Sequence, residues 1–165
     1  MEQYPILEIH ETNIFQNAER LLSLCRDHGI TPCAVVKGFC NCMPVTRQLV
    51  KAGFGELASS RVRHLAELKE AFPERSTLLL RIPMACEIAD VVRYCNACLV
   101  SEQTTIRLLN EEALKQGKRL KVILMRDVGD LREGVFAPAE FVRTAVQIEQ
   151  EAPGLHLYGV GCNLT

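Results

Sequence analysis

Lys37 is the residue of this sequence best placed to do chemistry. It follows four small or β-branched residues, Cys33-Ala34-Val35-Val36, at a point where a strand is expected to end. We expect its side chain to be partly withdrawn from water there, and burial disfavours the charged form of an amine. A neutral amine is the nucleophile that Schiff-base chemistry requires. A lysine at a strand end is otherwise often a surface residue whose charged head reaches water, so this segment alone leaves both interpretations open.

The eight cysteines raise a second possibility, a metal or disulfide site. Only two pairs are close, Cys40 with Cys42 and Cys95 with Cys98. A structural zinc site needs four ligands, commonly in two pairs with two residues between the members, and only the second pair has that spacing. Cys98 also begins an apolar run typical of a buried strand. We therefore expect free thiols and no metal, with Cys33 in the interior and Cys40 and Cys42 in the loop after Lys37.

Polar residues end the other apolar runs as well. In parallel α/β folds ligands bind at the carboxyl ends of the strands, so such residues point toward a site. One of them alone can simply mark where the chain leaves the core, but six groups in succession favour a site. Its lysine and several arginines predict an anionic ligand, either a carboxylate or a phosphate. The six groups are Lys37, Ser59-Ser60-Arg61, Arg81, Ser101, Arg126-Asp127 and Asn163.

The elements that must position these residues follow from periodicity. Apolar residues recur at helical spacing in six stretches, near residues 14–25, 45–52, 62–72, 88–94, 106–113 and 138–148. Short apolar runs between them predict strands at 33–36, 56–59, 77–82, 97–101, 121–127 and 155–163. Strands that alternate with helices in this way predict βαβ units and a parallel sheet. Both an open doubly wound sheet and a TIM-type barrel fit this pattern.

Composition limits the class of protein. The 165 residues carry 19 Lys plus Arg against 20 Asp plus Glu, a net charge of -1, with the two signs interleaved, which does not favour binding to nucleic acid. Hydrophobic residues make up 48%, as in an ordinary globular domain. No apolar run approaches the roughly 20 residues of a membrane helix, and the N-terminus does not resemble a signal peptide. We expect one domain in a cytoplasmic protein.

The segment Ala34-Val35-Val36-Lys37-Gly38 resembles the pyridoxal-lysine segment of the alanine racemase family. Residues 4–9, with Ile14 and Asn17-Ala18 after them, look like that family's N-terminal strand and first helix. Four further segments, in the right order, are similar to its ornithine racemase branch. These are residues 57–61, 80–84, 127–134 and 159–165, and the sharpest similarity is Gly-Asp-Leu-Arg-Glu-Gly at 129–134.

This resemblance implies a parallel TIM-type (β/α) barrel with pyridoxal 5'-phosphate at its mouth. Residues 1–165 would be the N-terminal part of the barrel domain, apparently truncated after about six barrel strands, with the first strand outside the ring. Contacts to the phosphate and the pyridine nitrogen would then lie beyond Thr165. The resemblance also implies a homo-oligomer, a dimer, acting on a small amino acid.

The same resemblance assigns roles to residues. Lys37 would form the Schiff base with the cofactor and act as the base on one face of the substrate. Arg61, Arg81 and Asn163 would contact the cofactor. Arg132 would bind the substrate carboxylate or the ring hydroxyl through its bidentate fork, although a loop arginine held by Asp130 or Glu133 is the structural alternative.

Other residues limit what can be carried over. Arg126 could pair with Asp127 simply to satisfy a crowded barrel interior. No residue is identifiable as the base on the second face of the substrate. Alanine racemases use a tyrosine there, and neither Tyr94 nor Tyr158 occupies a position that matches it.

Departures from the family pattern keep several functions open. His10 and Thr12 stand where relatives commonly have acidic residues, and Asn163 stands where alanine racemases have a histidine. These differences weigh against alanine and favour a diamino acid such as ornithine as the substrate of an amino acid racemase. The alternatives are a protein that binds pyridoxal phosphate without turnover and a cysteine-based metal or redox module.

Overall fold

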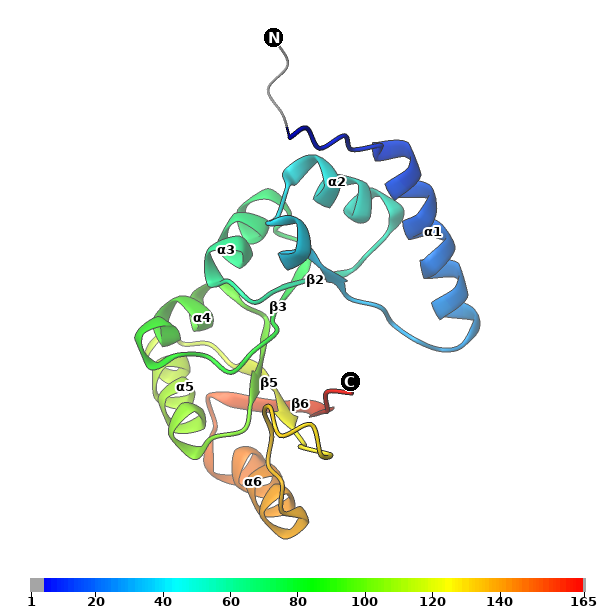
Figure 1. The fold of residues 1–165 in the computed structure, drawn as a ribbon. Helices are drawn as coiled ribbons and strands as arrows, with labels where there is room; N and C mark the ends of the chain where they lie inside the picture. Colours follow the sequence, from blue (N-terminus) through cyan, green and yellow to red (C-terminus); the bar gives the residue numbers. More distant parts are fainter. Residues whose placement is uncertain (1–4, 165) are drawn as a thin grey trace.

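Six strands alternate with six α-helices along residues 5–164, the part of the chain that the computed structural model describes (Figure 1). Two short 3-10 helices, η1 (Val36–Phe39) and η2 (Ala85–Glu87), interrupt the alternation. The helices are α1 (Glu11–Asp27), α2 (Met43–Ala52), α3 (Val62–Ala71), α4 (Ile88–Tyr94), α5 (Gln103–Lys115) and α6 (Pro138–Glu151). The strands are β1 (Ala34–Val35), β2 (Glu56–Ser59), β3 (Ser76–Leu79), β4 (Ala97–Val100), β5 (Leu120–Met125) and β6 (Leu155–Gly161).

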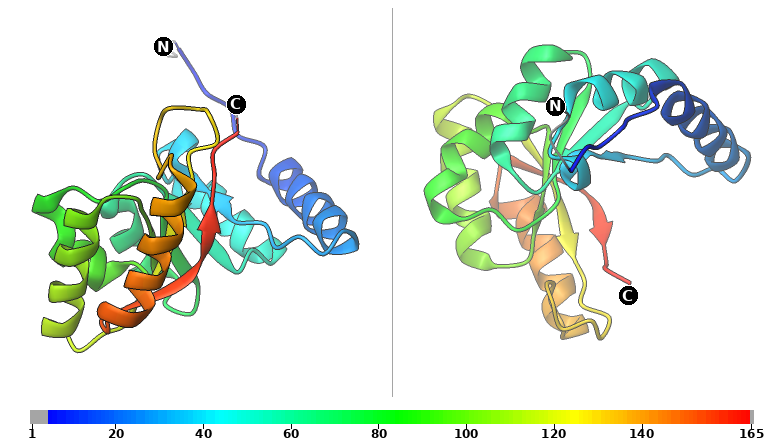
Figure 2. Two further views of the ribbon diagram at one scale, coloured as in Figure 1. Left: turned by 90° about the horizontal axis from the view of Figure 1, so that it is seen from below. Right: turned by 45° about the horizontal axis from the view of Figure 1, so that its top comes forward.

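The strands form one parallel sheet in the order β1-β2-β3-β4-β5-β6. The sheet curves, and the helices that follow its strands lie along its outer side (Figures 1 and 2). A doubly wound sheet would instead reverse its strand order and carry helices on both faces. The sequential order therefore selects the TIM-type barrel, which confirms the predicted fold class. Within residues 5–164 the sheet stays open, because β1 and β6 each pair with a single strand.

Most of the hydrophobic core lies between the sheet and the helices. Leu57, Leu79 and Leu124 are completely buried there, and Leu65 of α3 packs into the same cluster. A smaller apolar cluster lies on the other face of the strands, formed by Ala58, Leu78, Ala97, Leu99 and Met125. Alternate residues of a strand point to opposite faces, so each strand supplies both clusters. This two-sided burial explains why the strands read as short apolar runs in the sequence.

Helix boundaries follow local chemistry. Pro138 begins α6 as expected, because its missing N–H is not needed in the first turn of a helix. Gly53 ends α2 in the left-handed region, at a φ of 115°. An L residue rarely adopts that conformation, which makes glycine the natural stop. Within residues 5–164 no helix has both the length and the apolar character needed to cross a membrane.

The strand predicted at residues 4–9 is wrong for the residues that the structure describes. Residues 5–10 form neither helix nor strand, and Tyr4, like Thr165, lies outside the described residues. A strand needs a neighbour for its backbone N–H and C=O groups, and none of residues 11–164 pairs with this segment. Its apolar side chains are instead exposed, Leu7 by 84%.

Candidate functional site

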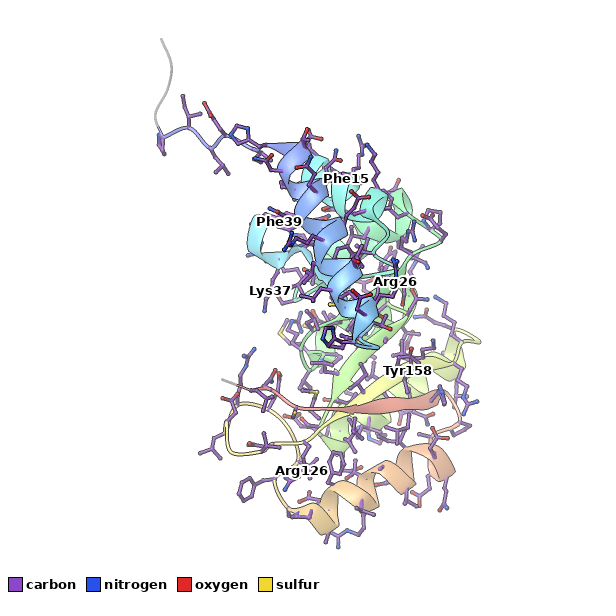
Figure 3. All side chains as sticks on the ribbon, turned by 90° about the vertical axis from the view of Figure 1, so that its right-hand side faces the viewer. Phe15, Arg26, Lys37, Phe39, Arg126 and Tyr158 are labelled. Carbon is purple, nitrogen blue, oxygen red and sulfur yellow. The ribbon has the colours of Figure 1, made fainter. Side chains whose placement is uncertain are left out.

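Because all six strands are parallel, their carboxyl ends lie along one edge of the sheet. Lys37 follows β1 at one end of this edge, and Arg126 follows β5 near the other end (Figure 3). Arg61 and Arg81 follow β2 and β3, while Asn163 follows β6. The structure therefore brings every candidate residue to the same edge of the sheet, in strand order.

Lys37 is exposed and lies in the 3-10 turn η1, which begins directly after β1. The expected partial withdrawal of its amine from water is therefore wrong in this structure. The expectation assumed that the apolar run was all strand, but β1 ends at Val35 and only Val36 of the turn is buried. Since β1 is at the edge of the sheet that residues 5–164 form, none of their other strands covers the outer side of the turn. The amine is open to a ligand that approaches the edge.

Asn41 fixes the turn that carries Lys37. Its backbone N–H donates to the carbonyl of Val36 at 3.0 Å, and it adopts a left-handed φ of 55°. Its buried side chain donates from Nδ2 to Glu67 of α3 at 2.9 Å. The hydroxyl of Thr46, on α2, lies 3.2 Å from its Oδ1. Two helices thus hold the residue that closes the turn. Sequence reasoning missed this role, although asparagine is, after glycine, among the residue types that best tolerate this backbone conformation.

Arg81 is bonded to the protein through all three guanidinium nitrogens. Nε donates to the carbonyl of Ser60 at 2.7 Å, and Nη1 donates to the carbonyl of Ile82 at 3.2 Å. Both terminal nitrogens also reach the carboxylate of Glu87, with Nη2 at 2.8 Å from Oε2. This pairing lowers the pKa of Glu87 and raises that of Arg81. Arg81 therefore ties the end of β3 to the end of β2 and to η2.

Glu87 was not anticipated from the sequence. It also accepts a hydrogen bond from the backbone N–H of Met84 at 3.0 Å, three residues earlier. An acidic side chain that bonds back across the first turn of a helix is a recognisable local signal. Its pairing with Arg81 depends on where the turn places the two side chains, which a spacing of six residues does not reveal.

A buried serine and histidine support the end of β2. Ser59 Oγ lies 3.0 Å from Nδ1 of His64, and it accepts the backbone N–H of Arg61 at 3.2 Å. Burial lowers the pKa of His64, which is 1% exposed. The neutral ring is thereby favoured in the folded chain. Arg61, the residue before α3, keeps an exposed side chain.

The loop after β5 is organised by Asp127, whose Oδ1 accepts the N–H groups of Gly129 at 2.8 Å and Leu131 at 3.2 Å. Gly134 closes the loop at a φ of 122°, and a Cβ there would lie 2.5 Å from the backbone nitrogen of Asp127. Only glycine fits this position. Arg132, between these two fixed points, is exposed.

The hydrogen bonds of this loop bear on the structural alternatives for Arg126 and Arg132. Arg126 does not pair with Asp127, as the crowded-interior alternative supposed. It donates to the carbonyls of Val135 and Phe136 instead. The side chain of Asn163 donates to Glu133 at 2.5 Å, which links β6 to the loop and gives Glu133 a partner other than Arg132.

The cysteines occupy varied environments. Cys33 is half-buried rather than interior, because the residue precedes β1, and burial together with Glu56 raises the pKa of its thiol to about 12. Cys40 is exposed and Cys42 half-buried, both just after η1 as predicted. Burial raises the pKa of Cys95 to about 12 and also raises the pKa of Cys98 well above its ordinary value. All eight cysteines lie within residues 5–164, and none of them forms a disulfide bond. In the same residues no group of three or more His, Cys, Asp or Glu side chains could hold a metal ion.

Residues 9–164 match the family described as alanine racemase, N-terminal domain. The chain belongs to this family. It is 35% identical over 162 residues to an ornithine racemase of Acetoanaerobium sticklandii and 32% identical over 160 residues to a lysine racemase of Thermotoga maritima. These alignments cover 98% and 97% of the chain but 45% and 44% of the two relatives. The chain thus spans less than half the length of the racemases that it matches.

Solved structures agree with the fold. An alanine racemase of Clostridium difficile 630 superposes with a TM-score of 0.79 at 21% identity, covering 94% of this chain and 40% of its own. PipY of Synechococcus elongatus PCC7942, solved with pyridoxal phosphate bound, superposes with a TM-score of 0.69 at 22% identity. That match covers 89% of this chain and 70% of PipY. At these identities the likeness concerns the fold, and its agreement supports the barrel assignment.

The residues present at this edge suit an anionic carbonyl cofactor. Lys37 offers an exposed amine, and Arg61 and Arg132 offer exposed guanidinium groups. Arg81 differs, because its donors are already bonded within the protein. Asn163 is half-buried, with its amide nitrogen bonded to Glu133. An amine with exposed guanidinium groups on the same edge is the donor set that an aldehyde bearing a phosphate requires.

Proposed function

We propose that the protein is a pyridoxal-phosphate-dependent amino acid racemase in which Lys37 binds the cofactor through a Schiff base. The observation that carries the proposal is the position of Lys37. In a member of the alanine racemase N-terminal domain family, it presents an exposed amine at the carboxyl end of β1. The strand ends are where a TIM-type barrel binds its ligands. Residues 1–165 then form the N-terminal part of the cofactor-binding barrel domain.

The roles of the chain's residues follow from their environments. When bound, the cofactor stabilises the negative charge left on Cα after proton removal. Once the amine of the substrate had displaced Lys37 from the cofactor, the freed Nζ would be the group that accepts the Cα proton on one face. The fork of Arg132 holds the substrate carboxylate or the ring hydroxyl. Arg61 would add positive charge for the cofactor, and Asn163 would contact it. Arg81 would hold the ends of β2 and β3 together at the same site.

A diamino acid is the proposed substrate. Two racemases to which the chain is similar over nearly its whole length act on ornithine and lysine, both of which carry a second amine. His10 and Thr12, at the start of α1, differ from the acidic residues common in relatives, and Asn163 replaces the histidine of alanine racemases. We further propose that the enzyme is a dimer in the cytoplasm.

Reduction with borohydride tests the assignment of Lys37. After incubation with pyridoxal phosphate, reduction and proteolysis, mass spectrometry should find the cofactor on the peptide that contains Lys37. Lys37→Ala should abolish this label and the visible absorbance band of the bound cofactor. Lys51→Ala, which removes another exposed lysine from α2, should change neither. Labelling of Lys51 or Lys121 with Lys37 untouched contradicts the proposal.

Cofactor binding without turnover is the second candidate, favoured by the likeness to PipY, most of whose length this chain covers. Racemisation assays on the full-length protein separate the two functions. L-ornithine, L-lysine and L-alanine would each be incubated with enzyme and cofactor while optical rotation is followed. Loss of rotation for the diamino acids supports the racemase. A protein that carries the Lys37 label but racemises none of a panel of amino acids is a cofactor-binding protein.

A further inference from the structure

A pocket of about 380 Å³ lies at the opposite edge of the sheet, where β4 and β5 begin. It is far from the strand ends that carry Lys37. The side chain of Tyr158, in the middle of β6, lies toward this amino edge, whereas Lys37 lies toward the other (Figure 3). Five of the ten residues that line the pocket are cationic, and none is acidic. These five, the amino-edge cations, are Lys69, Arg93, Lys118, Arg119 and Lys121.

None of the amino-edge cations forms an ion pair with a carboxylate of residues 5–164. Two of them bind carbonyls near helix ends. Lys118 donates to the carbonyls of Val92 and Arg93 at 3.1 and 2.9 Å, and Lys69 donates to that of Pro73 at 3.1 Å. These contacts offset the negative ends of α4 and α3, which would otherwise repel an anion. The remaining three cations are therefore in excess.

The three excess cations keep their charge available. Arg93 stacks on the ring of Tyr94 and Lys121 on the ring of Tyr158, with cation-to-centroid distances of 5.3 and 4.3 Å. Stacking on a ring orients a cation without neutralising it. Arg119 uses Nε to donate to the carbonyl of Leu155 at 3.0 Å, which leaves its terminal nitrogens for a ligand. In a chain whose net charge is -1, so uneven a distribution of charge is a local feature.

We propose that this pocket is a second binding site, separate from the Lys37 edge, for a small multivalent anion of the phosphate class. Guanidinium forks and ammonium groups both donate to phosphate oxygens. A singly charged carboxylate would leave most of the amino-edge cations unpaired, so a ligand with several negative charges fits best. Because the cations are largely exposed, binding weakens as ionic strength rises.

Titration calorimetry with inorganic pyrophosphate tests the site. The full-length protein should show saturable binding at low salt, and adding 0.5 M sodium chloride, roughly five times the ionic strength at which the Debye length is about 10 Å, should weaken it. Arg93→Gln combined with Lys121→Gln should weaken binding by roughly tenfold or more, since two charge-assisted contacts are lost. Arg20→Gln combined with Arg26→Gln is the matched control. It removes the same charge from exposed positions on α1 and should leave binding unchanged.

Lys37→Ala separates this site from the Lys37 edge, because it should leave pyrophosphate binding intact. Circular dichroism and the melting temperature show whether each variant is folded, so that a loss of binding can be read as a loss of contacts. Absence of saturable binding by the wild-type protein overturns the proposal. So does equal weakening by the α1 control, or loss of binding in Lys37→Ala with the Arg93/Lys121 variant unaffected.

Discussion

Replacing Asn41 with alanine should destabilise the chain by removing the residue that closes the Lys37 turn. The change deletes the hydrogen bonds of the side chain to Glu67 and Thr46, each of which contributes about 1 kcal/mol net. It also forces alanine into the left-handed conformation at a φ of 55°, which costs roughly 1 kcal/mol more than for asparagine. The sum is about 3 kcal/mol, equivalent to a fall in melting temperature of roughly 6–12 °C for a domain of this size.

Asn41→Gly separates the two contributions. Glycine adopts the left-handed conformation freely but makes no side-chain hydrogen bond, so it should cost about 2 kcal/mol, less than alanine does. Cys40→Ala is the matched control. Cys40 is exposed and has a similar φ of 51°. Cysteine and alanine both carry a β-carbon, so this substitution should change the free energy of unfolding by less than about 0.5 kcal/mol.

Urea unfolding followed by circular dichroism measures these differences as changes in the free energy of unfolding. The reasoning fails if Asn41→Ala is as stable as the wild type, or if Asn41→Gly is less stable than Asn41→Ala. Either result would mean that the side chain does not hold the turn or that its backbone is not strained. A result in the expected order would show that the exposed position of Lys37 is imposed by α2 and α3.

Three further predictions concern charge. Because the pKa of His64 is lowered in the folded chain, the unfolded chain binds the proton more readily, and the free energy of unfolding should fall as pH drops below about 6.5. His64→Asn can still form a hydrogen bond with Ser59 and should flatten this pH dependence, as measured by urea titrations at several pH values. Glu87→Gln leaves Arg81 without its carboxylate, so it should cost about 1–3 kcal/mol at pH 7. Because the folded pKa of Glu87 is lowered, this difference should shrink as pH falls below about 4.5, where the carboxyl of the unfolded wild-type chain becomes protonated first. An equal loss at pH 3 and pH 7 would refute this. For the proposed racemase activity of the full-length protein, Arg132→Lys should lower kcat/KM by roughly tenfold or more with little change in melting temperature. A large fall in melting temperature with normal activity would instead make Arg132 a structural residue.

The repeating part of the fold was predictable because each element carries its own period. The boundaries of β2 and α4 agree with the sequence prediction to the residue, at 56–59 and 88–94. The apolar residues of the helices pack against the sheet, and those of the strands pack on both of its faces, so the burial of each residue follows directly from the apolar pattern. The choice of a barrel over a doubly wound sheet depended instead on the family resemblance, since both folds produce the same alternation.

The turn after β1 was not predictable from hydropathy. The apolar run through Val36 predicts a strand that leaves Lys37 partly withdrawn from water, yet the strand ends one residue earlier. Tertiary contacts decide the outcome, since Asn41 binds residues on two different helices. Similarly, the segment at residues 4–9 has the composition of a strand, but composition does not supply a partner strand.

Arg81 and Arg132 show why residue type alone could not assign roles at the strand ends. Both were candidates for binding an anion on the same argument, that a guanidinium fork fits a carboxylate or phosphate. Arg81 already has such a carboxylate in Glu87, and the lowered pKa of Glu87 shows that the two charges compensate each other. The positive charge left at this edge therefore comes from groups such as Lys37, Arg61 and Arg132. A ligand attracted to the edge meets an amine and two guanidinium groups, while Arg81 contributes through the strands that it joins.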